Sequence, residues 1–244
     1  FRRTNIFWLG HFLISLLKTL SHFFHRHSSV CNILLEKIVE KCYNFFEISY
    51  WRVIFLKTAF IIHGFNGDTT YTFGPSLKNF LEKLGYQVIM PNFPIRAEAS
   101  YEKWSNILDN YKDLFDSETI VVAHSIGNPF FIRFLFTNNL VCKLYISVAG
   151  FCDLFTVPDR QDLTDAFVNF AVTPEVIDYA KSHILYRYSL YSNNDHVIPF
   201  SILKNYVKSL NSTPVYIEGV GHMGNRDNIT RLPQVEEIIS SLGE

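Results

Sequence analysis

Residues 119–135, TIVVAHSIGNPFFIRFL, run from a short apolar segment through a serine into a segment with apolar residues at helical spacing. An arrangement of strand, serine and helix is typical of the nucleophile elbow, a tight turn that holds its serine in strained backbone geometry. Only small side chains fit two positions before and two positions after that serine, and Ala123 and Gly127 occupy these positions around Ser125. The A-x-S-x-G pattern therefore predicts that Ser125 is a nucleophile, with an ordinary turn serine as the alternative.

Candidates for the base and the acid that would activate Ser125 lie further along the chain. A serine hydroxyl is a weak nucleophile unless a histidine, itself held by a carboxylate, takes its proton, and behind an elbow the chain order is Ser, Asp or Glu, His. His222 lies in the glycine-rich segment EGVGHMG (218–224), whose glycines let the loop place the imidazole over the elbow. Asp195, in SNNDHVIP (192–199), is the predicted acid, and Asp153, which follows the preceding apolar run, is the alternative.

The segment HGFNGD (63–68) follows an apolar run that ends at Ile62. A glycine at such a position lets the backbone approach a substrate closely. We therefore expect the N–H of Phe65 to join the N–H of Ile126 in binding an oxyanion, and the N-terminus of the helix after the serine adds the positive end of its dipole.

Short apolar runs alternate with helical patterns from residue 52 onward. Runs of strand length occur at 53–62, 87–90, 119–123, 141–148, 184–191 and 215–218. Such alternation predicts a mostly parallel sheet covered by helices on both faces. Residues 153–183 carry two short helical patterns, and we expect them to form a small cap-like insertion over the edge of the sheet where ligands bind in such folds.

The first 50 residues differ in composition from the rest. Residues 1–35 contain no acidic residue. The uncharged stretch 4–17 is shorter than the roughly 20 apolar residues that span a bilayer. One narrow polar stripe at helical spacing is formed by His11, Ser15, Lys18, His22 and His25, which predicts an amphipathic helix. A second helix is expected over 32–46, so residues 1–50 are predicted to form an N-terminal helical hairpin.

Three roles for this hairpin remain open. It packs on the main domain, it lies in a membrane interface, or it is a targeting segment that is removed. None of these roles is required for catalysis. We therefore expect the catalytic domain to cover residues 51–244. Contacts with a membrane surface or a protein, if they exist, are assigned to residues 1–50.

The overall composition excludes several classes of protein. The 244 residues are 48% apolar and 18% charged, which is unlike a disordered chain. The 22 basic residues face 23 acidic ones, so no excess of positive charge favours binding to nucleic acid. The four cysteines form no CxxC pair and no cluster at zinc spacing, so no metal site is predicted and a reducing, cytoplasmic location is expected.

Residues 57–244 resemble the small serine hydrolases of the α/β-hydrolase superfamily, in particular the retinoblastoma-binding-protein-like and YdeN-like proteins. The matching segments follow one another in the expected order: AFIIHGFNGD (59–68), PNFP (91–94), TIVVAHSIGNPFFIRFL (119–135), SVAGF (147–151), SNNDHVIPFS (192–201) and GVGHM (219–223). The resemblance implies an α/β-hydrolase fold, no cofactor, and the roles of nucleophile for Ser125, acid for Asp195 and base for His222. Residues 1–50 have no counterpart, and Met223 replaces a frequent Phe.

We expect a substrate pocket beside the serine, lined by His63, Gly64, His124, Phe151 and Met223. His124 and His196 each lie beside a stronger catalytic candidate and are expected to have structural or rim positions. The apolar walls permit many substrates, so the sequence predicts a serine hydrolase for a small-molecule carboxylic ester, amide or thioester without naming one. Two alternatives are a protein-interaction module that retains the fold with little activity and a membrane-associated lipid or acyl-protein esterase.

Overall fold

The computed structural model describes residues 57–70 and 72–242. Both predicted helices of residues 1–50, and the part of the first predicted strand before residue 57, lie outside the described residues. Residues 57–244 form one compact unit.

A single sheet organises the part of the chain that the structure describes. Its strands are all parallel and follow the order β2-β1-β3-β4-β5-β6. They are β1 (Thr58–Ile62), β2 (Gln87–Ile89), β3 (Ile120–His124), β4 (Cys142–Val148), β5 (Ile184–Tyr191) and β6 (Thr213–Tyr216). The register pairs Ala123 with Ile62 on one side and with Ser147 on the other, so the carboxyl ends of β1, β3 and β4 meet at one edge.

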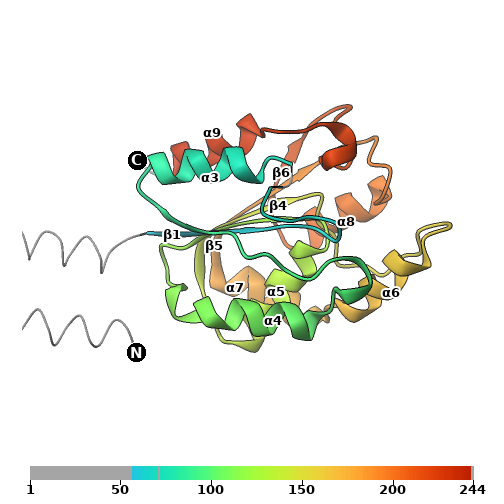
Figure 1. Cartoon of the computed structure of the whole chain (residues 1–244), viewed down its shortest axis with the longest axis horizontal. Coiled ribbons are helices and arrows are strands. Elements are labelled where there is room, and N and C mark those ends of the chain that lie inside the picture. The colour runs from blue at the N-terminus through green and yellow to red at the C-terminus, as the bar shows by residue number, and fades with distance from the viewer. Residues whose placement is uncertain (1–56, 71, 243–244) are drawn as a thin grey trace, which may run out of the picture. The chain divides into compact units, whose positions relative to one another are not determined.

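Helices cover both faces of this sheet (Figure 1). One face carries α3 (Gly74–Lys83) and α9 (Pro233–Ser241), and the other carries α4 (Tyr101–Leu108), α5 (Gly127–Thr137) and α7 (Pro174–His183). The remaining helices are α6 (Gln161–Asn169), α8 (Phe200–Ser209) and the short 3-10 helices η1 (Arg96–Glu98), η2 (Asp109–Leu114) and η3 (Asn225–Asp227). The predicted fold class, a mostly parallel sheet between layers of helices, is confirmed. Among the helices in residues 57–70 and 72–242, none combines the length and the hydropathy that a transmembrane helix requires.

The core explains why the central strands read as continuous apolar runs. Every residue of β1 and of β3 is buried, as expected for strands covered on both faces. Beside them Trp104 is fully buried, with its ring 4.5 Å from Phe93 and 5.1 Å from Phe130. Its indole N–H donates to the carbonyl of Pro94 at 2.8 Å, so this large side chain buries no unsatisfied donor.

The predicted insertion 153–183 contains two helices with different surroundings. α7 packs against α5 and β5, as a connecting helix on one face of the sheet does. α6 follows a loop in which Val157, Pro158 and Arg160 line a cleft at the carboxyl edge of the strands. Leu163 of α6 lines the same cleft. The part of the insertion that covers this edge is therefore the loop and the start of α6.

Candidate active site

Ser125 lies in the turn between β3, which ends at His124, and α5, which begins at Gly127. Its backbone φ is +53°, a left-handed conformation that is rare for a residue with a side chain. Its N–H donates to the carbonyl of Val148 at 2.9 Å, which ties the turn to the end of β4. Strained geometry of this kind, held by neighbouring structure, is what the elbow pattern predicts.

Position 127 has room only for a glycine, because residues 62 and 63 lie close to its Cα. A Cβ atom at this position would lie 2.8 Å from the carbonyl oxygen of His63 and 2.9 Å from Cγ2 of Ile62. Both residues belong to the end of β1 and the loop after it. A glycine two residues after the serine is thus required by the fit of the elbow against the neighbouring strand.

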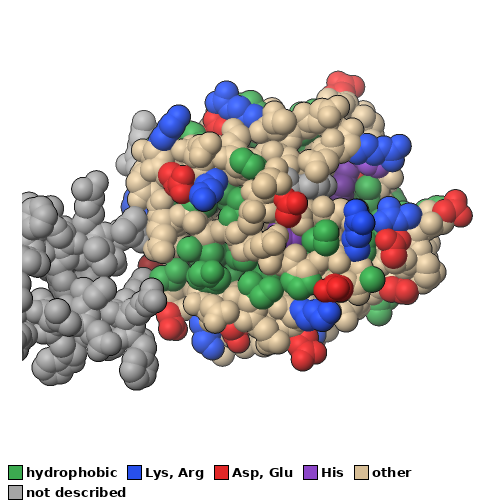
Figure 2. Space-filling view, viewed as in Figure 1, with side chains coloured by type: hydrophobic (Ala, Val, Ile, Leu, Met, Phe, Trp, Pro, Cys, Tyr) green, Lys and Arg blue, Asp and Glu red, His purple; other side chains and the backbone are tan. Residues whose placement is uncertain are grey.

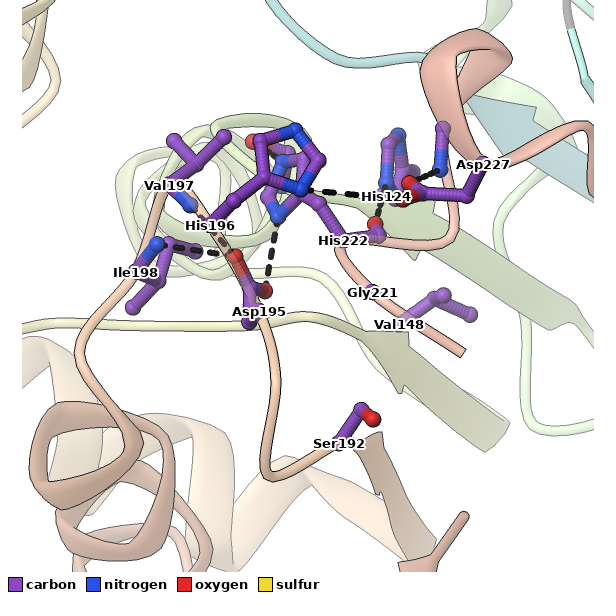
Figure 3. Close-up of polar contacts among 12 residues, drawn as sticks. His124, Val148, Ser192, Asp195, His196, Val197, Ile198, Gly221, His222 and Asp227 are labelled. Atoms are coloured by element: carbon purple, nitrogen blue, oxygen red, sulfur yellow. Dashed lines mark hydrogen bonds and ion pairs between the residues drawn. The ribbon is translucent and has the colours of Figure 1, made fainter. Parts of the chain in front are cut away.

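The three residues predicted as nucleophile, base and acid lie in hydrogen-bond contact. Nε2 of His222 is 3.0 Å from Oγ of Ser125. Nδ1 of His222 is 2.8 Å from Oδ2 of Asp195 (Figure 3). Ser125 and His222 are 5% and 8% exposed, so the reactive atoms are reachable but largely shielded from water. The carboxylate can only accept a hydrogen bond from Nδ1–H, which leaves Nε2 as the acceptor for the serine hydroxyl.

Asp195 is held in its charged form by several donors. The backbone N–H groups of Val197 and Ile198 donate to its Oδ1 at 2.8 and 2.9 Å (Figure 3). Burial acts to raise the pKa of Asp195, but the hydrogen bond and charge of His222 and these backbone donors outweigh it, so the pKa lies below its ordinary value. Asp153, the alternative acid, instead accepts a hydrogen bond from Asn205.

The loop that carries His222 is fixed by the residues just before Asp195. The N–H of Gly221 donates to the side-chain oxygen of Asn194 at 2.8 Å. Two further bonds of the same kind join Gly219 to Asn193 and Val220 to Ser192, at 3.1 and 3.2 Å. The side chains of 192–195 therefore bind consecutive residues of 219–222. We call residues 192–194 the acid-loop clamp.

His124 also holds the base. Its Nε2–H donates to the backbone carbonyl of His222 at 2.9 Å, since a carbonyl oxygen only accepts. Burial, followed by the nearby His222, lowers the pKa of His124 to about 3. A neutral imidazole directly before Ser125 thus connects the elbow to the loop of the base.

A buried polar network supports the elbow from behind, and no sequence pattern pointed to it. The amide nitrogen of Asn128 donates to the carbonyls of Ser125 and Val148 at 2.8 and 3.1 Å. Its amide oxygen accepts from the hydroxyl of Tyr145 at 2.6 Å, and that hydroxyl lies 2.9 Å from the hydroxyl of Tyr206. These contacts span residues far apart in the chain, so only the fold shows them.

The predicted oxyanion donors lie on two sides of the serine. The N–H of Ile126 is at the start of α5, and in the described part of the chain neither it nor the N–H of Phe65 donates a backbone hydrogen bond. Next to Phe65, a Cβ atom on Gly64 would be 3.1 Å from Cβ of Ser125. The loop after β1 therefore approaches the serine closely.

A cleft of about 440 Å³ opens above Ser125. Of the predicted pocket residues, Gly64 and His124 line it. His63, Phe151 and Met223 are buried and are not part of its lining. The ring of His63 is occupied in the loop, because Nδ1 donates to the carbonyl of Gly64 and Nε2 accepts the N–H of Phe93.

Phe151 and Met223 are both buried, each in different surroundings. Phe151 packs against Phe155 and Phe167, with ring centroids 5.4 and 4.7 Å apart, in the layer beneath α6. Met223 is fully buried at a positive φ of 55° immediately after the base. Among the described residues, no group of three or more His, Cys, Asp or Glu side chains is arranged to hold a metal ion.

Comparison with known proteins relates this geometry to a family. The model of the serine hydrolase family matches residues 59–241. YdeN of Bacillus subtilis (strain 168), which is named as a hydrolase, is 29% identical over 187 residues, covering 76% of this chain and 95% of YdeN.

Solved structures show the same fold. The crystal structure of the ydeN gene product from B. subtilis superposes with a TM-score of 0.66 at 28% identity, covering 76% of this chain and 97% of that one. Est1E from Butyrivibrio proteoclasticus, solved with ferulic acid bound, has a TM-score of 0.55 at 16% identity and covers 76% of this chain and 87% of its own. The similarity to Est1E concerns the fold alone.

Proposed function

Because the chain belongs to the serine hydrolase family, we propose that it cleaves carboxylic esters through an acyl-enzyme formed on Ser125. The observation that carries this proposal is the unbroken contact from Oγ of Ser125 through the imidazole of His222 to the carboxylate of Asp195. Family membership supports hydrolysis, and the contact supports the covalent route.

In the first half of the reaction, Nε2 of His222 takes the proton of Ser125 while Oγ attacks the ester carbonyl. The carbonyl oxygen becomes an oxyanion, which the N–H groups of Phe65 and Ile126 bind. When the tetrahedral adduct collapses, His222 gives the proton to the departing alkoxide and the acyl group stays on Ser125. Asp195 holds Nδ1–H throughout and stabilises the imidazolium.

In the second half, His222 takes a proton from water, and the resulting hydroxide attacks the acyl carbonyl. Collapse of the second tetrahedral adduct returns the proton to Oγ and releases the acid. The cycle consumes one water molecule and needs no other reactant. The cleft volume of about 440 Å³ lies within the range of small-molecule sites, which favours small esters as substrates.

Steady-state hydrolysis of p-nitrophenyl butyrate tests the proposal. We expect Ser125→Ala and His222→Ala to lower kcat by about a thousandfold or more, and Asp195→Asn to lower it strongly, because the imidazole loses its orientation. Asp153→Asn is the matched control, since Asp153 also follows a strand but contacts Asn205.

The proposal fails if folded Ser125→Ala keeps the activity of the wild type. It also fails if Asp153→Asn loses as much activity as Asp195→Asn. A folded wild-type protein that hydrolyses no ester of this size would instead favour a module that keeps the fold for binding.

A further inference from the structure

The cleft above Ser125 has two kinds of wall. The apolar residues that line it are Phe65, Val157, Pro158, Leu163 and Val197. The polar and charged residues are Asn66, Arg160, His196, Asn225, Arg226 and Asp227. The second group contains two arginines and one carboxylate, so charged side chains form part of the cleft wall.

Two carboxylates bear on the charge of this cleft, and both have partners. Asp227 lines the cleft, whereas Asp162 does not line it but pairs with the lining residue Arg160. Both carboxylate oxygens of Asp162 accept from the guanidinium of Arg160 at 2.8 Å. Asp227 accepts the backbone N–H of Gly224 at 3.0 Å and lies 3.6 Å from Nδ1 of His196 (Figure 3). The carboxylate of Asp162 is therefore paired with Arg160, and that of Asp227 is bound by the N–H of Gly224 and lies near His196.

Of the two arginines that line the cleft, Arg160 is paired with Asp162, whereas Arg226 is not part of these contacts. It lies on η3, four residues after the base, and its side chain is exposed. Within residues 57–70 and 72–242 it forms no ion pair. In Figure 2, basic side chains, with acidic ones next to them, lie beside histidines on the surface. A guanidinium at the rim of a cleft offers planar donors that match a carboxylate in bidentate fashion.

We propose that Arg226 binds an anionic group of the substrate, so that the enzyme prefers esters that carry a carboxylate apart from the ester bond. This inference rests on the proposed esterase function. The apolar wall formed by Val157, Pro158 and Leu163 receives the hydrocarbon part of such a substrate, and Arg226 receives its charge. Arg160 adds positive potential but is already paired with Asp162.

Two pairs of isosteric esters test this preference. On the alcohol side, 4-carboxyphenyl butyrate is compared with 4-carbamoylphenyl butyrate, and on the acyl side the monophenyl ester of adipic acid is compared with that of adipamic acid. We expect the wild type to show a higher kcat/KM for the carboxylate in at least one pair, by about tenfold, the value of one charged hydrogen bond.

Variants assign the preference to the arginine. Arg226→Gln should lower the ratio of carboxylate to amide turnover by about tenfold, because turnover of the carboxylate falls far more than turnover of the amide, and Arg226→Lys should keep part of the ratio. Lys204→Gln removes a charge on α8, where Lys204 lies over the ring of Phe200, and should change neither rate.

The inference is overturned if the wild type turns over both members of each pair at equal rates. It is also overturned if Arg226→Gln leaves the ratio unchanged, or slows the carboxylate and the amide equally. Failure of the underlying function would look different, because Ser125→Ala would then still hydrolyse the neutral amide-bearing esters.

Discussion

Ser125 keeps its left-handed backbone because the residues around it leave no alternative. Its N–H is bound by Val148, its carbonyl by Asn128, and the following helix begins against the end of β1. Strain of this kind costs on the order of 1–3 kcal/mol and persists only where neighbouring contacts impose it. Single residues at the elbow should therefore affect both stability and activity.

Gly127→Ala tests this fit. The added Cβ would meet the backbone of His63 and the side chain of Ile62, so we expect a loss of about 1–3 kcal/mol in the free energy of unfolding and a loss of activity. Urea denaturation and ester hydrolysis measure the two effects. Gly85→Ala is the control: its φ is +86° but no atom lies near the added Cβ, so it should cost stability without affecting kcat.

His124 should make the protein less stable in acid. Burial and the neighbouring His222 lower the pKa of His124 to about 3, whereas the unfolded chain takes up that proton near pH 6.5. The unfolded state thus binds more protons between these values, so the contribution of His124 to stability is complete above pH 6.5 and is lost as the pH falls toward 3.

In the His124→Gln variant, the side chain at position 124 does not titrate but still has an N–H that can donate to the carbonyl of His222. Its free energy of unfolding should fall less than that of the wild type between pH 7 and pH 4, by on the order of a few kcal/mol. Denaturation curves at several pH values give the free energy of unfolding of each protein as a function of pH. The same dependence on pH in the wild type and in His124→Gln would contradict this prediction. His63, whose pKa burial also lowers, accounts for part of the remaining slope.

At the scale of elements, the loop after β5 positions the loop after β6. Asn194 accepts both the N–H of Gly221 and the hydroxyl of Ser192, so it is the centre of the acid-loop clamp. We expect Asn194→Ala to lower kcat by about tenfold to a hundredfold with little change in KM, because a small displacement of His222 misaligns proton transfer. Asn194→Asp retains the acceptor oxygen and should recover much of the rate.

Asn193→Ala provides the comparison within the same loop. Within the described part of the chain, the side chain of Asn193 makes one hydrogen bond, to the N–H of Gly219, which lies further along the chain from the base. A smaller loss of kcat is expected for this variant, and equal losses for Asn193→Ala and Asn194→Ala would show that the clamp does not act through the position of His222. Thermal unfolding of each variant separates this effect from loss of folded protein.

Local patterns were sufficient for most elements of the sheet. The apolar runs predicted β3 and β4 within a residue, because strands buried on both faces need an uninterrupted apolar sequence. The last strand lies at 213–216 instead of 215–218, since an edge strand with exposed residues has no such constraint. The helix α7 was predicted as part of the insertion, but it packs on the sheet, and packing partners leave no local signal.

The candidate site was predictable where a motif carries its own geometry. The pattern around Ser125 predicts a tight turn, and the glycines around His222 predict a loop that can place the imidazole over this turn. The two side chains do lie in contact. The role of Asn128 in the buried network depends on Tyr145 and Tyr206, which the fold brings to it from distant segments. The burial of Phe151 likewise follows from its contact with α6, which the apolar character of the residue does not specify.

For the whole molecule, residues 57–244 contain all the contacts described for the site. They form a unit with its own core, and the family model matches 59–241. We expect a fragment of residues 57–244 to unfold cooperatively and to hydrolyse p-nitrophenyl butyrate with the kcat/KM of the full chain. Loss of activity in a folded fragment would show that residues 1–56 contribute to the site.

The central claim is that Ser125 is the nucleophile, and covalent trapping tests it most directly. The full-length protein is treated with a fluorophosphonate, which reacts with activated serines, and intact mass and peptide mapping locate the adduct. We expect one adduct, on Ser125, in the wild type and none in Ser125→Ala. His222→Ala should be labelled more slowly, because the hydroxyl keeps its proton. Equal labelling of wild type and Ser125→Ala, or an adduct on another residue, would contradict it.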